Sequence, residues 1–454
     1  MIESFLRSVS NFVWGIPLIL LLVGTSIYFS WKLKFLQVTH LKLAGKYLLR
    51  PSDDSASGDI SLFGSICTAL SATLGVGNIV GVALAISAGG PGALFWMWVA
   101  TFFGMAVKYS EGLLAIRYRQ VGNDGKICGG PMYYIELGLK SKWIARFFAF
   151  FGTLTATVSI GTWTQSNSIA VAARSFGIPT IVTAVIMGVL VAIITIGGIR
   201  RIANVSEKVV PFMTIFYILA AILVLIFKAT AIPQAFASIF IGAFSPRAVL
   251  GGGTGVSVMM VLQNGISRGI FAHESGLGSA AIASAAAKTN SPAQQGLVAM
   301  IGAFLSIVVC TMTALVLLVT QRETGIFIQA TDGTLLTSKA FGLGLGCPAL
   351  GKYIVNLGII FFAFTTVLGW NYYGEKCVQY LLGTRVISAY RILFLVFVII
   401  GPFYKIDLIF TVADIATGLM AIPNLIGLIG LRKIIFQETL AFEEELKHCH
   451  FPRK

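Results

Sequence analysis

The longest run without a charged residue constrains this chain more than any other feature. Residues 60–107 contain no Asp, Glu, Lys or Arg over 48 positions, and residues 289–321 contain none over 33. A helix needs about 20 predominantly apolar residues to cross a lipid bilayer. Each run is longer than one such helix. The chain is therefore predicted to be an all-α polytopic membrane protein.

The composition agrees with this class. Only 11% of the 454 residues are charged and 56% are apolar, whereas an ordinary soluble domain has about 25% charged residues. The net charge of +15 would suggest nucleic-acid binding in a soluble protein. Here the basic residues lie in short loops between apolar runs, so we expect a lipid bilayer around the chain and no nucleic-acid partner. The six scattered cysteines form no CxxC pair and indicate neither a disulfide framework nor a zinc site.

Apolar runs separated by charges and turn residues predict about 11 transmembrane helices. We expect these spans at residues 13–31, 60–88, 93–118, 147–176, 180–199, 209–227, 254–287, 295–320, 353–374, 392–403 and 408–431. The first is expected to be a span rather than a signal peptide, because it lacks a basic n-region followed by a small-residue cleavage site. Residues 229–246 are uncharged but short and bounded by prolines, so we expect an interfacial segment there.

The basic residues predict the orientation. With the N-terminus outside, 23 Lys and Arg residues fall in cytoplasmic loops and the tail, 8 fall on the opposite side, and Lys108 and Arg268 lie within spans. Cytoplasmic loops of membrane proteins carry an excess of Lys and Arg. We therefore expect a multi-pass protein of the cell membrane with its N-terminus outside and its tail, residues 437–454, in the cytoplasm.

Two spans contain clusters of glycine and small polar residues. Residues 71–78 read SATLGVGN in the second span, and residues 263–278 read QNGISRGIFAHESGLG in the seventh. Such clusters weaken a helix, and unpaired backbone in a membrane is tolerated only where it lines a buried cavity. Two interrupted spans at corresponding places in two halves indicate an inverted-repeat transporter with its site near the bilayer midplane.

Each interrupted span begins a series of five, which predicts a five-plus-five inverted repeat preceded by one extra helix. The chain divides accordingly into an extra N-terminal helix with a basic loop, a first repeat, an extracellular interfacial connection, a second repeat and a cytoplasmic tail. These units are residues 1–59, 60–228, 229–253, 254–431 and 432–454.

Four motifs follow one another along the chain. They are GVGNIVGVA at residues 75–83, GGPMYY at 129–134, QSNS at 165–168, and RG at 268–269 followed by ESGLGSA at 274–280. With these motifs the chain resembles the alanine or glycine:cation symporter family over nearly its whole length. The resemblance implies an eleven-span LeuT-type fold that couples sodium entry to the uptake of alanine or glycine. One departure is local: family members usually read Asn-Glu-Ala-Gly where this chain has HESG at residues 273–276.

A free amino acid is a zwitterion, so a dry site must satisfy its carboxylate and its ammonium group separately. Backbone N–H groups at a helix N-terminus suit the carboxylate, and carbonyls and hydroxyls suit the ammonium group. The residues expected to provide these groups at the first break are Thr73, Gly75, Val76, Gly77 and Asn78. Those expected to provide unwound carbonyls at the second break are Ile266, Ser267 and Gly269. A packing face of small residues remains the alternative interpretation of the first break.

The LeuT-type resemblance also implies a sodium site between the first interrupted span and the ninth span. Thr365 and Thr366 would supply hydroxyls to the ion. Carbonyls would come from Ser71, Leu74 and Phe362, and Thr366 is also expected to contact the substrate. The alternative is that both threonines bond to carbonyls of their own helix, as threonine commonly does.

Other polar and aromatic residues within spans are candidates for the site. The resemblance implies that Gln165 faces the ligand, whereas Asn167 could form a helix–helix hydrogen bond instead. Trp370 is a candidate wall that limits side-chain size. Charged residues inside a membrane are functional candidates by default. The spacing of Arg268 and Glu274 suggests a pair that ties the loop of the second broken helix, or a gate element.

The remaining charges allow simpler interpretations. Lys108 and Glu111 are one turn apart near a helix end, where an ordinary ion pair suffices. Asp414 could form a gate or pair with a neighbouring helix, and the sequence leaves both open.

These observations favour a sodium-coupled symporter of small neutral amino acids that works by alternating access, with alanine or glycine as substrate and sodium as the co-transported ion. An uncoupled channel or facilitator is the alternative, although a channel does not require two broken helices opposite a hydroxyl pair. An enzyme is not expected. His273 and Glu274 are the only neighbouring histidine and acid, and adjacent positions do not converge on one helix face. The sequence leaves the oligomeric state open.

Overall fold

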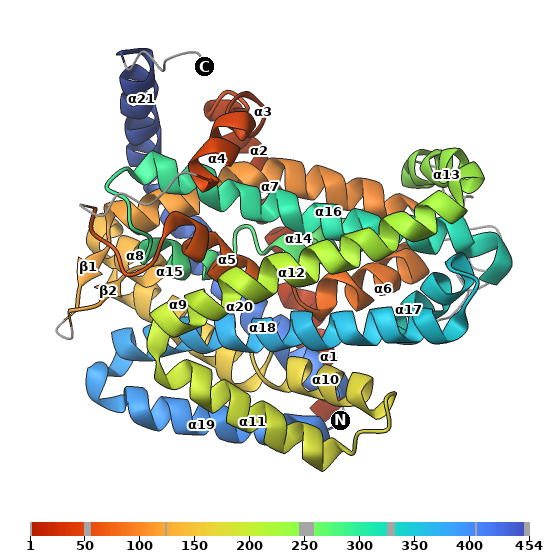
Figure 1. The fold of residues 1–454 in the computed structure, drawn as a ribbon. Coiled ribbons are helices and arrows are strands. Elements are labelled where there is room, and N and C mark those ends of the chain that lie inside the picture. The colour runs from red at the N-terminus through yellow and green to blue at the C-terminus, as the bar shows by residue number, and fades with distance from the viewer. Residues whose placement is uncertain are drawn as a thin grey trace.

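The structure is a computed structural model that describes residues 2–49, 56–122, 125–244, 258–324, 332–404 and 406–448. Nearly all of these residues are helical (Figure 1). The strands among them are β1 (Gln120–Val121) and β2 (Ile127–Cys128), which form a small antiparallel hairpin with Gln120 opposite Cys128.

Within the described residues, seven helical segments are long and apolar enough to cross a membrane. They are α7 (Gly92–Arg117), α9 with α10 (Lys142–Val158 and Trp163–Arg174), α12 (Gly198–Phe227), α16 (Pro292–Thr324), α18 (Pro348–Leu382), α19 (Ile387–Ile400) with its flanking 3-10 turns η3 (Thr384–Val386) and η4 (Gly401–Phe403), and α20 (Ile406–Gly430). The helices α7, α16, α12 and α18 run across the view in nearly the same direction and form the body of the molecule (Figure 1).

The other helices are shorter. The apolar ones are α2 (Ile16–Lys32), α5 (Leu62–Thr73), α6 (Val80–Gly89), α11 (Thr180–Ile196) and α13 (Ile232–Phe244), which follows the 3-10 turn η2 (Ala229–Ala231). The rest are α1 (Ile2–Val13), α3 (Leu36–Thr39), α4 (Leu41–Leu48), η1 (Val76–Asn78), α8 (Pro131–Leu139), α14 (Val258–His273), α15 (Ser279–Ala285), α17 (Gly333–Gly344) and α21 (Arg432–His448). Neither α8 nor α17 was expected from the sequence.

The interruptions of the second and seventh spans are both present. The helices α5 and α6 are separated by η1, and α14 and α15 are separated by residues 274–278. A third interruption, at residues 159–162 between α9 and α10, was not predicted. The expected interfacial segment contains α13, and the part of the predicted connection beyond Phe244 lies outside the described residues until Val258. The number of spans stays a prediction.

Small residues allow the central helices to approach one another closely. A side chain on Gly112 of α7 would collide with Ala299 of α16, and one on Gly296 of α16 would collide with Tyr109 of α7. Because lipid provides no hydrophobic drive for helix association, such close backbone packing is a main source of stability in membranes. Helices α7 and α16 therefore form a closely packed pair next to the interrupted helices.

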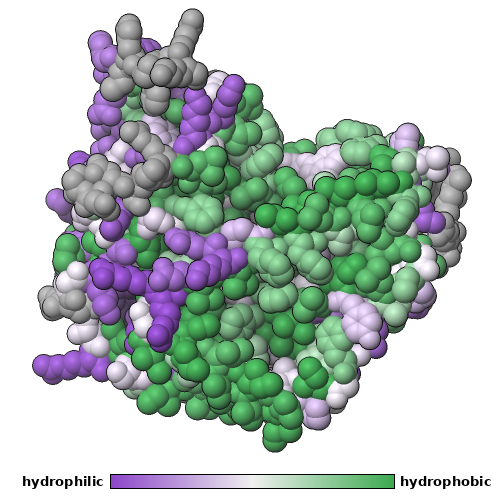
Figure 2. Space-filling model, in the orientation of Figure 1, coloured by the Kyte–Doolittle hydropathy of each residue, from purple (hydrophilic) through white to green (hydrophobic). Residues whose placement is uncertain are grey.

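Hydrophobic side chains cover the middle of the molecule (Figure 2). Exposed large apolar residues recur along α11, α12 and α19, for example Ile181, Phe212 and Ile392. Most hydrophilic side chains on this face gather at the end where β1, β2 and α21 lie, whereas α13 and α17 lie at the opposite end (Figures 1 and 2). The segments predicted to be cytoplasmic and those predicted to be extracellular thus lie at opposite ends.

Candidate substrate and ion site

The first break begins where α5 ends at Thr73. The capping residue Leu74 leaves helical geometry (φ −80°, ψ 89°), and Gly75 is extended. The N–H of Gly75 donates to Oδ1 of Asn78 at 3.0 Å. Val76 and Gly77 then open η1, so their N–H groups have no acceptor within that short helix. The break therefore presents the Leu74 carbonyl and two backbone donors.

Asn78 is fully buried but holds the break together rather than facing the cavity described below. Its Nδ2 donates to the Ser306 hydroxyl of α16 at 2.8 Å and lies 3.4 Å from the Ala272 carbonyl near the end of α14. The side chain thus joins both interrupted helices to α16. This geometry does not support a direct contact between the Asn78 side chain and the substrate.

The second break lies further along the chain than the sequence suggested. The helix α14 continues to His273, and the chain unwinds at residues 274–278, where Glu274, Gly276 and Gly278 have φ values of 52°, 89° and 78°. The expectation of unwound carbonyls at three positions is therefore wrong, because those residues lie inside α14, where carbonyls bond to the next helical turn. These residues are Ile266, Ser267 and Gly269.

A carboxylate from α7 holds this second break open. Oε1 of Glu111 accepts the N–H groups of Gly276 at 3.0 Å and Gly278 at 3.1 Å, together with Nδ2 of Asn424 at 2.8 Å. Nδ2 of Asn424 also lies 2.8 Å from the Gly276 carbonyl, and the Tyr134 hydroxyl donates to Asn424. The interpretation of Glu111 as part of an ordinary helix-end pair is therefore wrong, since this carboxylate replaces the missing helical partners of the loop.

A cavity of about 100 Å³ lies between the two breaks. Six of the predicted substrate residues line it, namely Thr73, Gly75, Val76, Gly77, Gln165 and Thr366. Five do not, namely Asn78, Ile266, Ser267, Gly269 and Trp370. Its lining also includes Ile160, which comes from the unpredicted break between α9 and α10. The sequence signal for this break is Gly161, because a side chain at that position would collide with Ala156 and Trp370.

Gln165 and Thr366 crowd the first break. A Cβ atom on Gly75 would lie 2.9 Å from the Thr366 hydroxyl and 3.7 Å from the Gln165 amide. A Cβ on Gly77 would meet nothing within 4 Å. The absence of a side chain at Gly75 thus permits close helix packing, and its absence at Gly77 leaves space open beside the backbone donors.

Trp370 and Asn167 are both buried beside this region. The Trp370 side chain lies near Glu274 and does not line the cavity itself, and its Nε1 has no hydrogen-bond partner within the described structure. Nδ2 of Asn167 donates to the backbone carbonyl of Tyr404 at 2.8 Å, so this bond joins α10 to the bend after η4 and not to another helix.

Some of the predicted sodium ligands meet where α18 crosses the first break. The Thr366 hydroxyl lies 2.9 Å from the Phe362 carbonyl and 3.3 Å from the Leu74 carbonyl. The Thr365 hydroxyl donates to the Phe362 carbonyl at 3.0 Å and also lies near the sulfur of Met213. Bonds of both threonines to their own helix are thus present, and the sodium assignment stays a prediction.

Ser71 lies one turn before the break and packs closely against α18. Its hydroxyl donates to the Thr68 carbonyl at 2.7 Å, and a Cβ on Gly369 would lie 2.8 Å from that hydroxyl oxygen. The structure therefore brings Leu74, Phe362 and Thr366 into direct contact and places Ser71 next to them.

The charged residues of the lining are arranged differently from the predicted pairing. Arg268, Glu274 and Asp414 all line the cavity. Arg268 interacts electrostatically with Asp414 of α20, whereas Glu274 accepts a hydrogen bond from the Ser279 hydroxyl at 2.6 Å. The expected pair of Arg268 with Glu274 is therefore wrong, and Asp414 belongs to the site.

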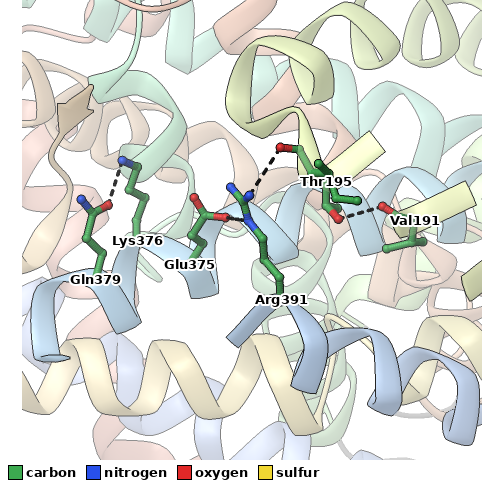
Figure 3. A network of polar contacts seen from close by, with 7 residues as sticks. Val191, Thr195, Glu375, Lys376, Gln379 and Arg391 are labelled. Carbon is green, nitrogen blue, oxygen red and sulfur yellow. Dashed lines mark hydrogen bonds and ion pairs between the residues drawn. The ribbon is translucent and has the colours of Figure 1, made fainter. Parts of the chain in front are cut away.

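Buried charges at the far end of α18 have partners of their own (Figure 3). Glu375 accepts a hydrogen bond from Nε of Arg391 at 2.8 Å, and Lys376 donates to Gln379 at 3.0 Å. Arg391 comes from α19, so its pair with Glu375 joins two helices. These satisfied charges stabilise the helix end and do not face the cavity.

Comparisons with known proteins agree with this geometry. A family model described as the sodium:alanine symporter family matches residues 1–453. The sodium/alanine symporter AgcS of Methanococcus maripaludis is 44% identical over 98% of this chain and 98% of its own length. An uncharacterized transporter of Haemophilus influenzae is 48% identical over 99% and 98%. A probable sodium/glutamine symporter GlnT of Bacillus subtilis is 34% identical over 98% and 92%.

A solved structure supports the fold. The substrate-bound, outward-open form of a Na⁺-coupled sialic acid symporter matches with a TM-score of 0.51 and 13% identity, over 90% of this chain and 82% of that chain. The predicted all-α membrane fold of the LeuT type is thereby confirmed.

Proposed function

The chain belongs to the sodium:alanine symporter family, and on this premise we propose that it imports alanine and glycine by alternating access. It is a membrane transporter and not an enzyme, and sodium is its co-transported ion. The finer parts of the proposal are the identity of the substrates, the residues that bind them and the orientation, with the N-terminus outside.

The observation that carries the proposal is the cavity between the two breaks. Its volume of about 100 Å³ is far below the roughly 300–1,000 Å³ of pockets for drug-sized ligands, which favours a very small substrate. Backbone donors of Val76 and Gly77 suit a carboxylate at one end. The hydroxyl of Thr73 and the amide of Gln165 offer further polar contacts within the same walls.

Coupling would arise at Thr366. This residue lines the cavity and also lies next to the Leu74 and Phe362 carbonyls, where we place sodium together with Ser71 and Thr365. An ion there would tie α18 to the first broken helix. Because a ligand shifts a conformational equilibrium only through different affinities for the two states, sodium would favour the state in which this contact is closed and the substrate wall complete.

The order of helices is compatible with two repeats of five. We propose residues 60–228 and 254–431 as these repeats, joined by 229–253, preceded by the unit 1–59 and followed by the tail 432–454. Each repeat then begins with an interrupted helix, α5–α6 or α14–α15. Alternating access would be a rocking of elements around the cavity where the two interruptions meet.

Uptake into proteoliposomes tests the proposal. An inward sodium gradient should concentrate labelled alanine above its external concentration, and an equal potassium gradient should not. Equilibration of alanine without accumulation would instead indicate an uncoupled channel or facilitator. Accumulation of other solutes but not of alanine or glycine would contradict the substrate assignment.

A further inference from the structure

Three charged residues form a buried cluster beside the second break. Lys108 and Glu111 of α7 and Glu274 of the unwound loop are between 1% and 4% exposed. Lys108 is close enough to interact electrostatically with both carboxylates, but its ammonium group has no hydrogen-bond partner among the described residues. Buried charges in a membrane are costly unless they are paired.

His273 does not add a positive charge to this cluster. The backbone N–H of Ser275 donates to Nδ1 of His273 at 3.1 Å. A backbone N–H can only donate, so Nδ1 carries no proton and the imidazole is neutral with its proton on Nε2. Within the described cluster, Lys108 is therefore the one group that can carry a positive charge, and it lies near two carboxyl groups.

The two carboxylates differ in what satisfies them. Glu111 accepts two backbone N–H groups and the Asn424 amide through Oε1, while its Oε2 has no hydrogen-bond partner within the described structure. Glu274 accepts the Ser279 hydroxyl, faces Thr73 and Trp370, and lines the cavity. Of the two, Glu274 is thus the carboxyl group that a ligand in the cavity can reach.

Two other charged residues belong to the described lining. They are Arg268 and Asp414, which have opposite signs and interact with each other. A second and independent observation also points to a ligand with donor groups: Gln165, 4% exposed, lines the same cavity, and its Oε1 has no hydrogen-bond partner within the described structure. A buried acceptor of this kind is rare unless something donates to it.

We propose that the carboxylate of Glu274 binds the ammonium group of the substrate. This inference rests on the proposed function and gives a role in substrate binding to Glu274, which the sequence offers only as a partner of Arg268 or a gate element. An ammonium group has three donors and one positive charge, so it can pair with the carboxylate of Glu274 and also donate to acceptors such as Gln165. The substrate carboxylate would then lie toward Val76 and Gly77, which share the cavity lining with Glu274.

Two variants separate charge from shape. Glu274→Gln keeps the size of the side chain and removes its charge, whereas Glu274→Asp keeps the charge and shortens the side chain. Loss of one partner of a buried charge pair should weaken sodium-dependent alanine binding by at least about 30-fold in Glu274→Gln, and Glu274→Asp should bind alanine more tightly than Glu274→Gln. Calorimetry on the purified variants measures both alanine affinities. A rise in the melting temperature of each variant on addition of sodium shows that the variant is folded.

Each result has a defined meaning. Unchanged alanine affinity in Glu274→Gln would overturn the proposal, as would weaker binding in Glu274→Asp than in Glu274→Gln. A shift in the sodium requirement at unchanged alanine affinity would also overturn the proposal and would assign the carboxylate to sodium. If Glu274→Gln does not fold, Glu274→Ala provides the uncharged comparison, and unchanged alanine affinity in that variant overturns the proposal. Failure of the unmodified protein to bind alanine would instead contradict the proposed function.

Discussion

The hydroxyl of Thr366 lies 3.3 Å from the carbonyl oxygen of Leu74, so α18 meets the first interrupted helix at this pair of residues. The same threonine lines the substrate cavity. An ion bound here would share a wall with the substrate, which is the shortest route by which occupancy of one site can affect the other.

Removal of both hydroxyls should weaken sodium activation. Loss of a polar partner of a charged group costs about 1.5–3 kcal/mol, so the double variant Thr365→Ala/Thr366→Ala should need at least about tenfold more sodium for half-maximal alanine uptake. A control is Thr320→Ala in α16, whose buried hydroxyl bonds to the Val316 carbonyl of its own helix. Unchanged sodium dependence in the folded double variant would remove these threonines from the ion site.

Gly77→Val should abolish alanine binding. A Cβ on Gly77 meets nothing within 4 Å, so the protein should fold, but the branched side chain would occupy space beside the backbone donors of the cavity. Gly24→Val in α2 is a matched control, since a Cβ there also meets nothing within 4 Å and Gly24 does not line the cavity. Alanine affinity that survives in Gly77→Val would show that the carboxylate binds elsewhere.

The cavity should reject large side chains. Each methylene group gained or lost in a tight pocket changes binding by roughly 1–3 kcal/mol, and the space of about 100 Å³ is bounded by closely packed elements near Gly75 and Gln165. Counterflow in proteoliposomes should therefore show exchange of alanine and glycine and little exchange of leucine. Equal exchange of leucine and alanine would refute a cavity of this size.

Glu111→Gln should loosen the second break without removing the proposed ammonium partner. The carboxylate oxygen accepts two backbone donors and one amide, and hydrogen bonds to a charged group contribute about 1.5–3 kcal/mol each. We expect a lower melting temperature and faster hydrogen exchange at residues 276–278, with a smaller loss of alanine affinity than in Glu274→Gln. Unchanged exchange in that loop would show that Glu111 does not hold it.

Cys347 provides a test of the orientation. It is exposed, whereas the other described cysteines are buried, and the predicted orientation places it outside. A membrane-impermeant maleimide added to intact cells should label the protein, and the label should be absent in Cys347→Ser. Labelling of Cys347 only after the membrane is permeabilised would reverse the orientation.

The first break could be predicted from the sequence because GVGN at residues 75–78 concentrates weak helix formers within an uncharged run. The direction of the Asn78 side chain could not, since helical periodicity is lost across a break and its partner Ser306 lies 228 residues away.

The second break lies later in the chain than the sequence predicts. The glycines of residues 263–278 mark a weak region, but Gly269 packs within a continuous helix, against Met97 of α7. The unwound part is fixed at residues 274–278 by Glu111, which accepts their backbone donors from α7. Such tertiary partners have no local sequence signature. For the same reason the sequence leaves open that Asp414 interacts with a neighbouring helix but does not identify Arg268 as the residue there.

Alanine affinity measured against sodium concentration tests the central claim most directly. If one cavity couples both ligands, sodium should tighten alanine binding, potassium should not, and alanine should tighten sodium binding by the same factor, because coupling between two sites is reciprocal. Titrations of the purified protein by calorimetry give both factors. Equal alanine affinity in sodium and potassium would contradict the account.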